Sequence, residues 1–504
     1  MEYDYIIKGG AVYAGGGNPV QYVDIAVLGD QISYIGPNEA KDIPAREVID
    51  ATGLVVAPGF IDPHTHSLGD LQSSGKNLNL NYLKQGVTTV FAGNDGAGSP
   101  NVAEVMRGLE QGGVGTNIAL YIGHGAVRRA VMGDESRAPT PAELDTMKAL
   151  VKSGMQEGAL GLSSGLYYAP GSFADTDEIV ELASVVAGYC GVYDSHIRDE
   201  SSYTVGLLAA VTEAIEIGRR AGVPTHISHI KALGVDVHGM SNEVVALVDE
   251  ARVAGLKVTA DQYPWLASGT SIAASLVPRW VMAGGGDVMK SRLVDADLRL
   301  KIRAEMAENL RRRGGAGSLL LVGENTEWRG KTLAQMAARW GDDAIDAAIR
   351  IIMAGDTSVA SFNMNKDDVA YFMQQPWVMT GSDGSSGHPR KYGTYPQKYQ
   401  QYVVKDRVLS LAEFVHKSSG LVADTFGMAR RGYLREGYVA DIVVFDPHAY
   451  RSNASYTEPD RLSSGVQYLF VGGQPAIWAG QETAVIAGRI IRNEANCAVG
   501  RSGR

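Results

Sequence analysis

Two histidines separated by one residue follow a short apolar run near the start of the chain. The run contains Phe60 and Ile61, and the histidines are His64 and His66. Alternate residues of a β-strand point to the same face, so this spacing places both imidazoles side by side. Imidazoles in this arrangement bind transition metals such as Zn²⁺ once other segments bring further ligands. On its own, the pair would more often be two ordinary histidines near a turn.

Later apolar or β-branched runs also end in histidine. His196 follows Tyr193-Asp194-Ser195, and His229 ends the segment Thr225-His226-Ile227-Ser228-His229. His226 and His229 lie three positions apart, so they face opposite sides of a strand. We predict that His229, at the end of the run, is a ligand, and we leave His226 between a ligand role and a structural role.

An aspartate ends the last apolar run. Val378-Met379-Thr380 leads through Gly381 and Ser382 to Asp383, which precedes a glycine-rich loop. A carboxylate at that place can bind a metal or accept a proton from metal-bound water. An aspartate before glycine is also common in plain turns. The order of the candidates along the chain, a histidine pair, two single histidines and an aspartate, favours the functional interpretation.

Strands and helices must bring these residues together. Between about residues 58 and 430, short apolar runs alternate with amphipathic stretches, which predicts parallel strands connected by covering helices. In a TIM-type (β/α)8 barrel, the carboxyl ends of the strands meet at one face, where such enzymes keep their sites. We therefore predict an α/β protein with this barrel. The predicted strands are Thr88–Phe91, Ile118–Ile122, Leu160–Leu162, Val192–Ser195, Thr225–Ser228, Val258–Ala260 and Val378–Thr380.

The two ends of the chain have a different sequence pattern, in which short predicted strands are interrupted by glycines. This pattern runs from Tyr5 to Val56, returns from Leu434 to Pro447, and occurs again around Ala484 to Ile491. It predicts one small β-sandwich formed from both ends. The predicted domains are residues 1–57 and 431–504 for the sandwich and C-terminal tail, and 58–430 for a metal-dependent barrel with an insertion near 284–318.

The composition is that of a globular protein and limits the classes of molecule that it can bind. Of 504 residues, 45% are hydrophobic and 20% charged, and the formal net charge is -10 without a basic block, which argues against nucleic acid as a partner. We find no apolar stretch long enough for a membrane span and no signal peptide, which predicts a cytoplasmic protein. A periplasmic or secreted location is the alternative if an export signal has been removed. A homodimer is left open.

Several segments together resemble the D-aminoacylase (N-acyl-D-amino-acid deacylase) family of the amidohydrolase superfamily. The resemblance spans nearly the whole chain and implies zinc-dependent hydrolysis of the amide bond of N-acyl-D-amino acids, with one or two Zn²⁺ per subunit. The segments are Pro58–His66, Gly158–Tyr168, Ser195–Arg198, Ser228–Lys231, Asp261–Pro264, His388–Pro396 and Gly437–Pro447.

Matching positions of this family imply roles for individual residues. His64, His66 and Asp383 would surround one metal position, and His196 and His229 would hold the other. Asp383 would act as the catalytic acid and base during attack of metal-bound hydroxide on the amide. The positions that match substrate-binding residues are Tyr168, near the scissile carbonyl, and Lys231, Tyr263 and Arg390, around the α-carboxylate.

One position departs from the family pattern. Where the D-aminoacylases usually have a cysteine metal ligand after the second barrel strand, this chain has Asp95. The Ala159–Leu162 strand also lacks the lysine that other amidohydrolases carboxylate to bridge two metals. A carboxylate can bridge zinc ions through its two oxygens, so we predict that Asp95 is a bridging metal ligand. A turn aspartate without a metal is the alternative.

Other functions remain open at this stage. Cyclic-amide or dipeptide hydrolases of the superfamily share the metal set but normally use the bridging lysine. Deaminases share the histidine pair and the late aspartate, and Glu200 lies near His196, although the expected acid/base glutamate motif is missing. A non-catalytic scaffold on the same fold is the third alternative. The loop Trp265–Trp280 carries apolar residues and Arg279, so a substrate with an apolar or an acidic side chain would be compatible.

Overall fold

Parallel strands form the centre of the molecule. The computed structural model describes residues 2–37 and 44–493. In the described part, β7, β8 and β9 pair in parallel, and β10, β11, β12, β13, β14 and β18 form a second parallel set in chain order. Only Tyr121 separates β9 from β10. The strands are β7 (Phe60–Asp62), β8 (Val87–Ala92), β9 (Asn117–Leu120), β10 (Ile122–Gly123), β11 (Gly161–Gly165), β12 (Val192–His196), β13 (Thr225–Ile227), β14 (Val258–Gln262) and β18 (Val378–Thr380).

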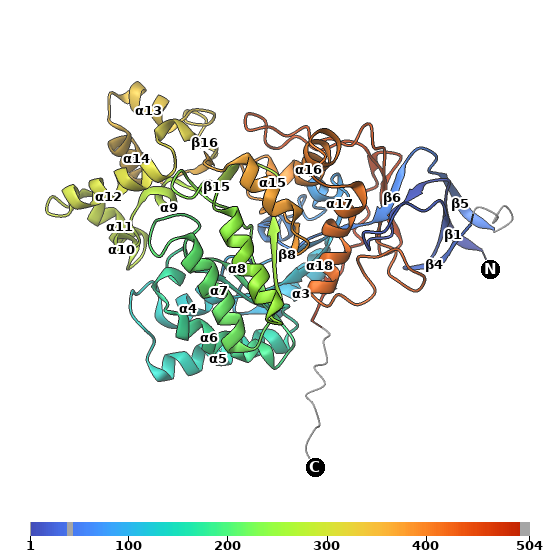
Figure 1. The fold of residues 1–504 in the computed structure, drawn as a ribbon, viewed down its shortest axis with the longest axis horizontal. Helices are drawn as coiled ribbons and strands as arrows, with labels where there is room; N and C mark the ends of the chain where they lie inside the picture. Colours follow the sequence, from blue (N-terminus) through green and yellow to red (C-terminus); the bar gives the residue numbers. More distant parts are fainter. Residues whose placement is uncertain (1, 38–43, 494–504) are drawn as a thin grey trace, which may run out of the picture.

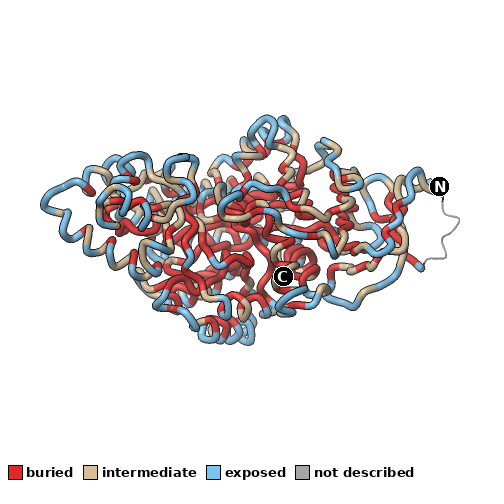
Figure 2. The backbone as a smooth tube through the Cα atoms, turned by 90° about the horizontal axis from the view of Figure 1, so that it is seen from above, coloured by how far each residue is buried: buried red, intermediate tan, exposed pale blue. Residues whose placement is uncertain are grey.

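Helices connect these strands and cover them on the outside (Figure 1). The alternation predicted from the sequence is therefore confirmed. The residues of the central strands are buried, while the outer helices carry both buried and exposed residues (Figure 2). The helices of this region are α1 (Leu68–Leu71), α2 (Leu80–Leu83), α3 (Val102–Gly112), α4 (His124–Met132), α5 (Pro141–Gln156), α6 (Thr176–Ala187), α7 (Leu207–Ala221), α8 (Ser241–Val253), α15 (Lys366–Gln374), α16 (Arg390–Lys398), α17 (Leu411–Ser418) and α18 (Gly420–Thr425).

Local sequence explains where a helix such as α5 begins. The Thr140 hydroxyl accepts a hydrogen bond from the Glu143 amide, and the Glu143 carboxylate accepts one from the Thr140 amide at 2.7 Å. This reciprocal cap, with Pro141 in the first turn, satisfies amide donors that the helix itself leaves free. Met147, Val151 and Met155 then recur every four residues and form the buried face of the helix.

Backbone contacts connect the ends of β7 and β18, the first and last parallel strands. The Asp383 amide donates to the His64 carbonyl at 2.9 Å, and the His66 amide donates to the Gly384 carbonyl at 3.3 Å. The buried Asp62 carboxylate accepts hydrogen bonds from the amides of His64 and Ser382. The segments that carry the histidine pair and the late aspartate are thus held next to each other.

Strands from both chain ends lie together at one end of the molecule (Figure 1). One sheet has the order β4-β3-β1-β5, and the other joins β2 and β6 to β19, β20, β21 and β22. Apolar residues of both sheets form one buried cluster. The strands are β1 (Tyr3–Lys8), β2 (Ala11–Val12), β3 (Asp24–Leu28), β4 (Gln31–Gly36), β5 (Ala45–Asp50), β6 (Val55–Pro58), β19 (Ile442–Phe445), β20 (Val466–Val471), β21 (Gln474–Trp478) and β22 (Gln481–Glu482).

The last described strand pairs with a different sheet from the one that the sequence indicated. The sequence pattern around 484–491 indicated a further strand of the two sheets formed by the chain ends, but β23 (Ile490–Ile491) pairs with β9. Because β11 pairs with β10 and not with β9, the edge of β9 at Ile118 and Ala119 is open. β23 satisfies the backbone groups of that edge.

A long excursion between β14 and β18 forms the opposite end of the molecule (Figure 1). It contains an antiparallel sheet of order β15-β17-β16 and has its own apolar cluster. The predicted insertion near 284–318 lies inside it and carries α11 and α12. The elements are β15 (Ala267–Ser271), α9 (Ile272–Leu276), α10 (Arg279–Met282), α11 (Gly286–Val294), α12 (Arg299–Arg312), β16 (Leu319–Leu321), α13 (Leu333–Trp340), α14 (Ala344–Met353) and β17 (Ser358–Phe362).

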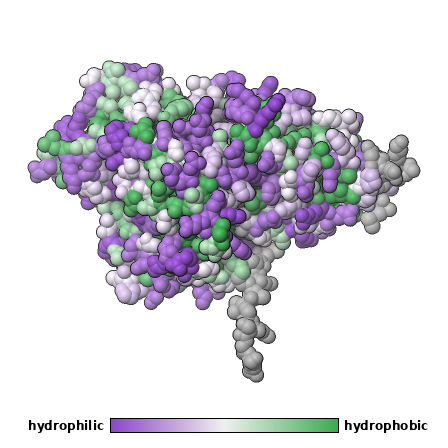
Figure 3. Space-filling view, viewed as in Figure 1, coloured by the Kyte–Doolittle hydropathy of each residue, from purple (hydrophilic) through white to green (hydrophobic). Residues whose placement is uncertain are grey.

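The surface mixes hydrophilic residues with small hydrophobic groups on the face shown in Figure 3. Among the described residues, none of the helices combines the length and the apolar character needed to span a membrane.

Candidate metal centre

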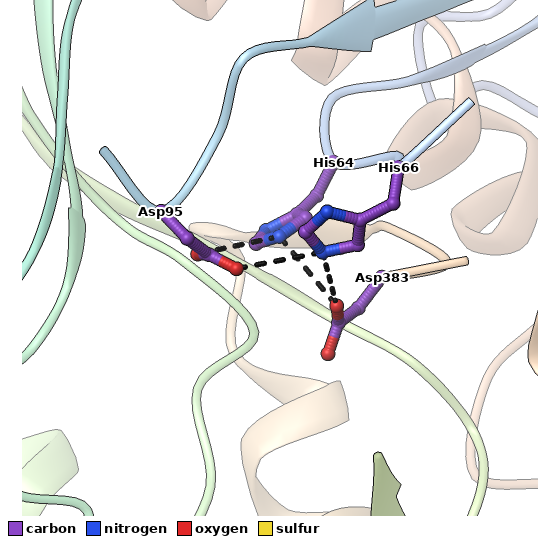
Figure 4. Close-up of side chains that lie close together, drawn as sticks. All are labelled: His64, His66, Asp95 and Asp383. Carbon is purple, nitrogen blue, oxygen red and sulfur yellow. Dashed lines mark hydrogen bonds and ion pairs between the residues drawn. The ribbon is translucent and has the colours of Figure 1, made fainter. Parts of the chain in front are cut away.

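The predicted metal ligands come together in two groups that share Asp95. His64, His66, Asp95 and Asp383 form one group, in which the ligand atoms lie within 4.8 Å of one another (Figure 4). Asp95, His196 and His229 form the other. His196 is the last residue of β12, and the others follow β7, β8, β13 and β18 by two to four residues, so all of them stand at the carboxyl ends of parallel strands. The predicted convergence of these residues is what the structure shows.

The Asp95 carboxylate lies between four imidazoles. Its Oδ1 atom is 3.5 Å from His64 Nε2, 3.6 Å from His196 Nδ1 and 3.5 Å from His229 Nε2, and its Oδ2 atom is 3.4 Å from His66 Nε2. Asp383 Oδ1 completes the first group at 3.1 Å from His66 Nε2 and 3.6 Å from His64 Nε2. Asp95 therefore lies between the two groups of predicted ligands and belongs to both.

Several ligand atoms in this group are buried and have no hydrogen-bond partner. They include both ring nitrogens of His64, both ring nitrogens of His196 and Oδ1 of Asp95. Buried polar atoms without partners are costly unless an ion or water satisfies them. Ligand atoms about 2.1 Å from a tetrahedral Zn²⁺ lie roughly 3.4 Å apart, close to the spacings around Asp95. The donor set and its spacing therefore fit zinc.

Close backbone packing holds the loop that carries Asp95. Asp95 has a left-handed backbone with φ of 56°. A Cβ atom on Gly165 would lie only 2.2 Å from the Asp95 carbonyl oxygen, so β11 can approach this loop only with glycine there. His229 and Asp383 are also left-handed, with φ of 36° and 47°. Non-glycine residues in this conformation are concentrated at functional sites, where surrounding structure compensates for the strain.

Two buried carboxylates orient the histidines from behind. Asp261 Oδ2 lies 3.0 Å from His226 Nε2 and 3.6 Å from His64 Nδ1, which leaves His64 Nε2 directed towards Asp95. Room for Asp261 exists because residue 381 is glycine, where a Cβ atom would lie 2.3 Å from Asp261 Oδ1. His226, left open by the sequence, is thus a buried structural residue beside Asp261. Such second partners fix the ring orientation and the tautomer of metal-binding histidines.

Glu200 performs the corresponding role on the other side of the site. Its Oε1 atom lies 3.0 Å from His229 Nδ1 and 2.6 Å from Lys231 Nζ, and its Oε2 atom lies 3.9 Å from His196 Nε2. Lys231 Nζ also lies 2.7 Å from His229 Nδ1. Because Nδ1 is held by these two neighbours, Nε2 of His229 faces Asp95. The sequence offered Glu200 only as a candidate for deaminase chemistry, and its position four residues after His196 was the signal available.

Burial and neighbouring charges act against each other at the carboxylates. Burial disfavours the ionised form of Asp95, but the surrounding histidines, His64 first, hold the pKa of Asp95 well below its usual range. Burial likewise opposes ionisation of Glu200, and Lys231 lowers the pKa of that carboxyl. Burial lowers the pKa of His196 and so favours the neutral imidazole. Against the effect of burial, neighbouring carboxylates raise the pKa of His64, His66 and His229, so these imidazoles hold protons in the metal-free centre and release them when a metal binds.

A cavity of about 370 Å³ opens beside the ligands and is lined by all the predicted site residues except His64, which lies behind them. Tyr263 is buried between two cations, at 5.5 Å from Lys231 Nζ and 4.9 Å from Arg390 Cζ, measured to its ring centroid. Arg390 Nη1 also lies 2.6 Å from Asp383 Oδ2. The ring of Tyr168 contacts that of His196, with centroids 4.8 Å apart. The four predicted substrate-binding residues therefore share one cavity with the metal ligands.

Known proteins define the class to which this fold and site belong. Residues 47–229 match the model of the amidohydrolase family. The chain is 32% identical to a D-aminoacylase of Alcaligenes xylosoxydans xylosoxydans over 98% of both chains, and 33% identical to an N-acyl-D-aspartate deacylase of the same organism over 95% of this chain and 93% of the relative. The protein is an amidohydrolase.

Solved structures agree with the sequence relatives. A D-aminoacylase with a binuclear metal centre superimposes with a TM-score of 0.83 at 30% identity, covering 97% of this chain and 100% of the other. The N-acyl-D-glutamate deacylase of Bordetella bronchiseptica, in complex with zinc and a phosphonate inhibitor, gives a TM-score of 0.83 at 31% identity, covering 98% and 100%. Within the amidohydrolases, this chain belongs to the family of D-aminoacylases and N-acyl-D-amino-acid deacylases.

The position of Asp261 behind His64 generates a testable expectation. Asp261→Asn should weaken binding of Zn²⁺ by about 10- to 100-fold, because the carboxylate no longer orients His64 and His226. The measurement is a zinc titration of the metal-free protein against a competing chelator. Asp368→Asn is the matched control, since Asp368 is also buried and accepts hydrogen bonds from the Gly239 and Ser241 amides away from the site. Equal zinc affinity of the Asp261→Asn variant and the wild type would contradict the orienting role.

Proposed function

We propose that this protein hydrolyses the amide bond of N-acyl-D-amino acids with the help of zinc, releasing a carboxylate and a free D-amino acid. The observation that carries the proposal is the Asp95 carboxylate surrounded by four imidazoles in a cavity that also contains Lys231 and Arg390. The family relationship supports the same reaction, since the relatives are named as deacylases of D-amino acids.

The ligands divide between two metal positions that share Asp95, and one or two Zn²⁺ are proposed. His64, His66 and Asp383 would hold one position, and His196 and His229 the other. Bound zinc lowers the pKa of a coordinated water and polarises a carbonyl group. The protein contributes Asp261 and Glu200, which keep the nitrogens of the proposed ligands oriented. The first metal position would face the cavity beside His66, whose side chain is 35% exposed.

Asp383 is the proposed general acid and base. It belongs to the group around His64 and His66 and lines the cavity, so it can accept a proton from the attacking water and return one to the departing amine. Arg390 contacts the second oxygen of the same carboxylate. A substrate carboxylate bound to Arg390 would therefore lie beside the group that transfers the proton.

The α-carboxylate of the substrate is the proposed ligand of Lys231, Tyr263 and Arg390. An ammonium, a phenol and a guanidinium all donate hydrogen bonds to a carboxylate, and charge-assisted bonds of this kind are the stronger ones. Burial raises the pKa of Tyr263 well above its usual value, so its hydroxyl keeps the proton it would donate. Tyr168, against His196, is placed to contact the scissile carbonyl.

The alternatives have weaker support. Strand β11 reads Gly-Leu-Ser-Ser-Gly and contains no lysine to bridge two metals, as cyclic-amide hydrolases of the superfamily would normally require. The dihydroorotase of Lactobacillus gasseri is 22% identical, and a dihydropyrimidinase structure is 16% identical with a TM-score of 0.57, a likeness of fold. Glu200 contacts Lys231 and His229 in an orienting position, which disfavours a deaminase, and a scaffold would not need a full set of converging ligands.

For the architecture, we propose a closed (β/α)8 barrel at 58–430 with an insertion near 284–318, and a small β-sandwich formed by 1–57 and 431–504. The bonds between the segments after β7 and β18 support closure, and the shared apolar cluster of the two end sheets supports the sandwich within the described residues. A cytoplasmic location and a homodimer stay predictions.

The proposed reaction is tested by a hydrolysis assay with N-acetyl-D- and N-acetyl-L-amino acids of matched side chains, in the presence of zinc. We expect turnover of D-substrates with kcat/KM at least about 100-fold above that of the L-forms, because a pocket that fixes the α-carboxylate and the scissile carbonyl orients one enantiomer. Metal content is determined on the same preparation. Bound zinc without turnover of any D-substrate would contradict the proposed reaction.

The carboxylate-binding role of Lys231 and Arg390 has a separate test. Lys231→Met and Arg390→Met should each lower kcat/KM by about 100-fold or more with zinc content retained, since each removes a charged donor to the substrate. Lys391→Met is a matched control, because Lys391 is equally buried but pairs with Asp70 and lines a different cavity. Unchanged kinetics in both test variants would exclude the assignment.

A further inference from the structure

His388 is a buried histidine that lines the cavity but has no role in the proposed reaction. It is 1% exposed and stands two residues before Arg390, the first residue of α16. The other histidines of the cavity wall, His66, His196 and His229, belong to the two metal groups. His388 belongs to neither of these groups, so its function has to be found in its other contacts.

Backbone groups occupy both ring nitrogens of His388. The Arg390 amide donates to Nδ1 at 3.1 Å, and Nε2 lies 3.0 Å from the carbonyl oxygen of Ala267 in β15. An amide only donates and a carbonyl only accepts, so Nε2 carries the proton and Nδ1 does not. Burial, together with the charge of Arg390, lowers the pKa of His388 well below its usual value, which keeps the ring neutral. Neither nitrogen is therefore available to bind a metal or to transfer a proton.

The ring joins the start of α16 to β15, and both elements carry groups that face the substrate. α16 begins with Arg390, the residue proposed to bind the α-carboxylate. In β15, the Gly269 carbonyl oxygen lies 3.5 Å from Arg390 Nη2, and the Thr270 hydroxyl lies 3.5 Å from the Tyr168 hydroxyl. One short strand thus contacts both the residue proposed for the α-carboxylate and the residue proposed for the scissile carbonyl.

Local geometry keeps β15 close to α16. Residue 269 is glycine, and a Cβ atom there would lie 2.7 Å from Arg390 Nη2, so a larger residue would push the guanidinium away. β15 also pairs with β17 along its whole length, which makes it a stiff segment. The bond from His388 to Ala267 therefore holds Gly269 and Thr270 in place as well.

The distance between these two contacts has a counterpart in the substrate. In an N-acyl-α-amino acid, a single carbon atom separates the amide nitrogen from the carboxylate. A misplacement of about 1 Å between a substrate and the groups that position it can cost on the order of 100-fold in rate. A strand that fixes Arg390 relative to Tyr168 therefore selects substrates by the separation of carboxylate and amide.

We propose that His388 is a positioning residue that holds β15 against α16 and so sets the distance between the carboxylate-binding and the carbonyl-binding groups. The inference rests on the proposed deacylase function and extends it to a discrimination between α- and β-amino acids. In the β-compounds, the carboxylate lies one CH2 group further from the amide. A structural alternative is that His388 only stabilises the fold, in which case its loss affects both substrate classes equally.

The test compares two substrates that differ only in the position of the carboxylate. The N-acetyl-D-amino acid that the wild type hydrolyses fastest is paired with its β-homologue, for example N-acetyl-D-alanine with N-acetyl-D-β-homoalanine. We expect the kcat/KM of the wild type to favour the α-compound by about 100-fold or more, because the additional CH2 group displaces the carboxylate by about 1 Å or more.

Asparagine and glutamine separate the two contacts of His388. The amide oxygen of asparagine takes the place of Nδ1 and keeps the Arg390 contact, whereas the amide nitrogen of glutamine takes the place of Nε2 and reaches Ala267. His388→Asn should lower the preference for the α-compound by about 10-fold or more, with a higher KM, and His388→Gln should retain it within about threefold. Both variants keep the bond from the Trp265 indole to the Thr394 hydroxyl of α16, which attaches the segment before β15 independently.

Gly269→Ala tests the position of β15 without a change at His388. Its Cβ atom displaces Arg390 Nη2, so this variant should also lower the preference for the α-compound. His416→Asn is the matched control and should leave the ratio unchanged. His416 likewise contacts a backbone carbonyl, that of Gly15, but does not line the cavity. Zinc content is determined for every variant.

The outcomes separate this inference from the function on which it rests. A wild type without preference for the α-compound, an equal loss for both compounds in His388→Asn, or an unchanged ratio in Gly269→Ala would overturn the positioning role alone. If His388→Asn does not fold, His388→Gln and Gly269→Ala still decide the question. No turnover of any N-acyl-D-amino acid by the zinc-loaded wild type would overturn the proposed function, and the positioning role with it.

Discussion

The Asp95 carboxylate among four imidazoles is the interaction on which the rest of the site depends. His64 and His66 approach it from the segment after β7, and the other two imidazoles approach it from the ends of β12 and β13. The distances of 3.4–3.6 Å are longer than an ordinary hydrogen bond and short enough for these groups to share a cation. The parallel strands bring the ligands to one face, and Asp261 and Glu200 turn their rings inwards. A carboxylate in this place adds a negative charge with two donor oxygens, which suits it to contact both metal positions.

The backbone around the site adopts strained conformations that this geometry requires. Asp95, His229 and Asp383 all adopt left-handed backbone conformations, each of which costs on the order of 1–3 kcal/mol for a residue with a side chain. Each lies two or three residues beyond the end of its strand, where a sharp change of direction brings the side chain back over the strand ends. Glycines at 165 and 381 let neighbouring groups approach closely enough to hold these turns. Packing of rigid strands thus supports strained ligand positions.

Much of this arrangement could be predicted from the sequence, for identifiable reasons. Strand ends are marked by apolar runs that stop at His196 or Asp383, and the parallel topology then brings those residues together. Asp95 was predicted through resemblance, because nothing in Gly93-Asn94-Asp95-Gly96 distinguishes a ligand from a turn. The orienting contact of Asp261 with His64 could not be predicted, since it depends on how closely β14 approaches the segment after β7. The pairing of β23 with β9 likewise depends on an edge that only the three-dimensional arrangement leaves open.

The central claim is that Asp95 is shared by two metal positions, and anomalous diffraction at the zinc edge from zinc-soaked crystals tests it most directly. The account predicts two peaks roughly 3.5–4 Å apart, the usual spacing of two-metal sites, with an oxygen of Asp95 coordinated to each. At limiting zinc, a single peak would still contact Asp95. Zinc coordinated by the histidines with Asp95 turned away from it would contradict the account.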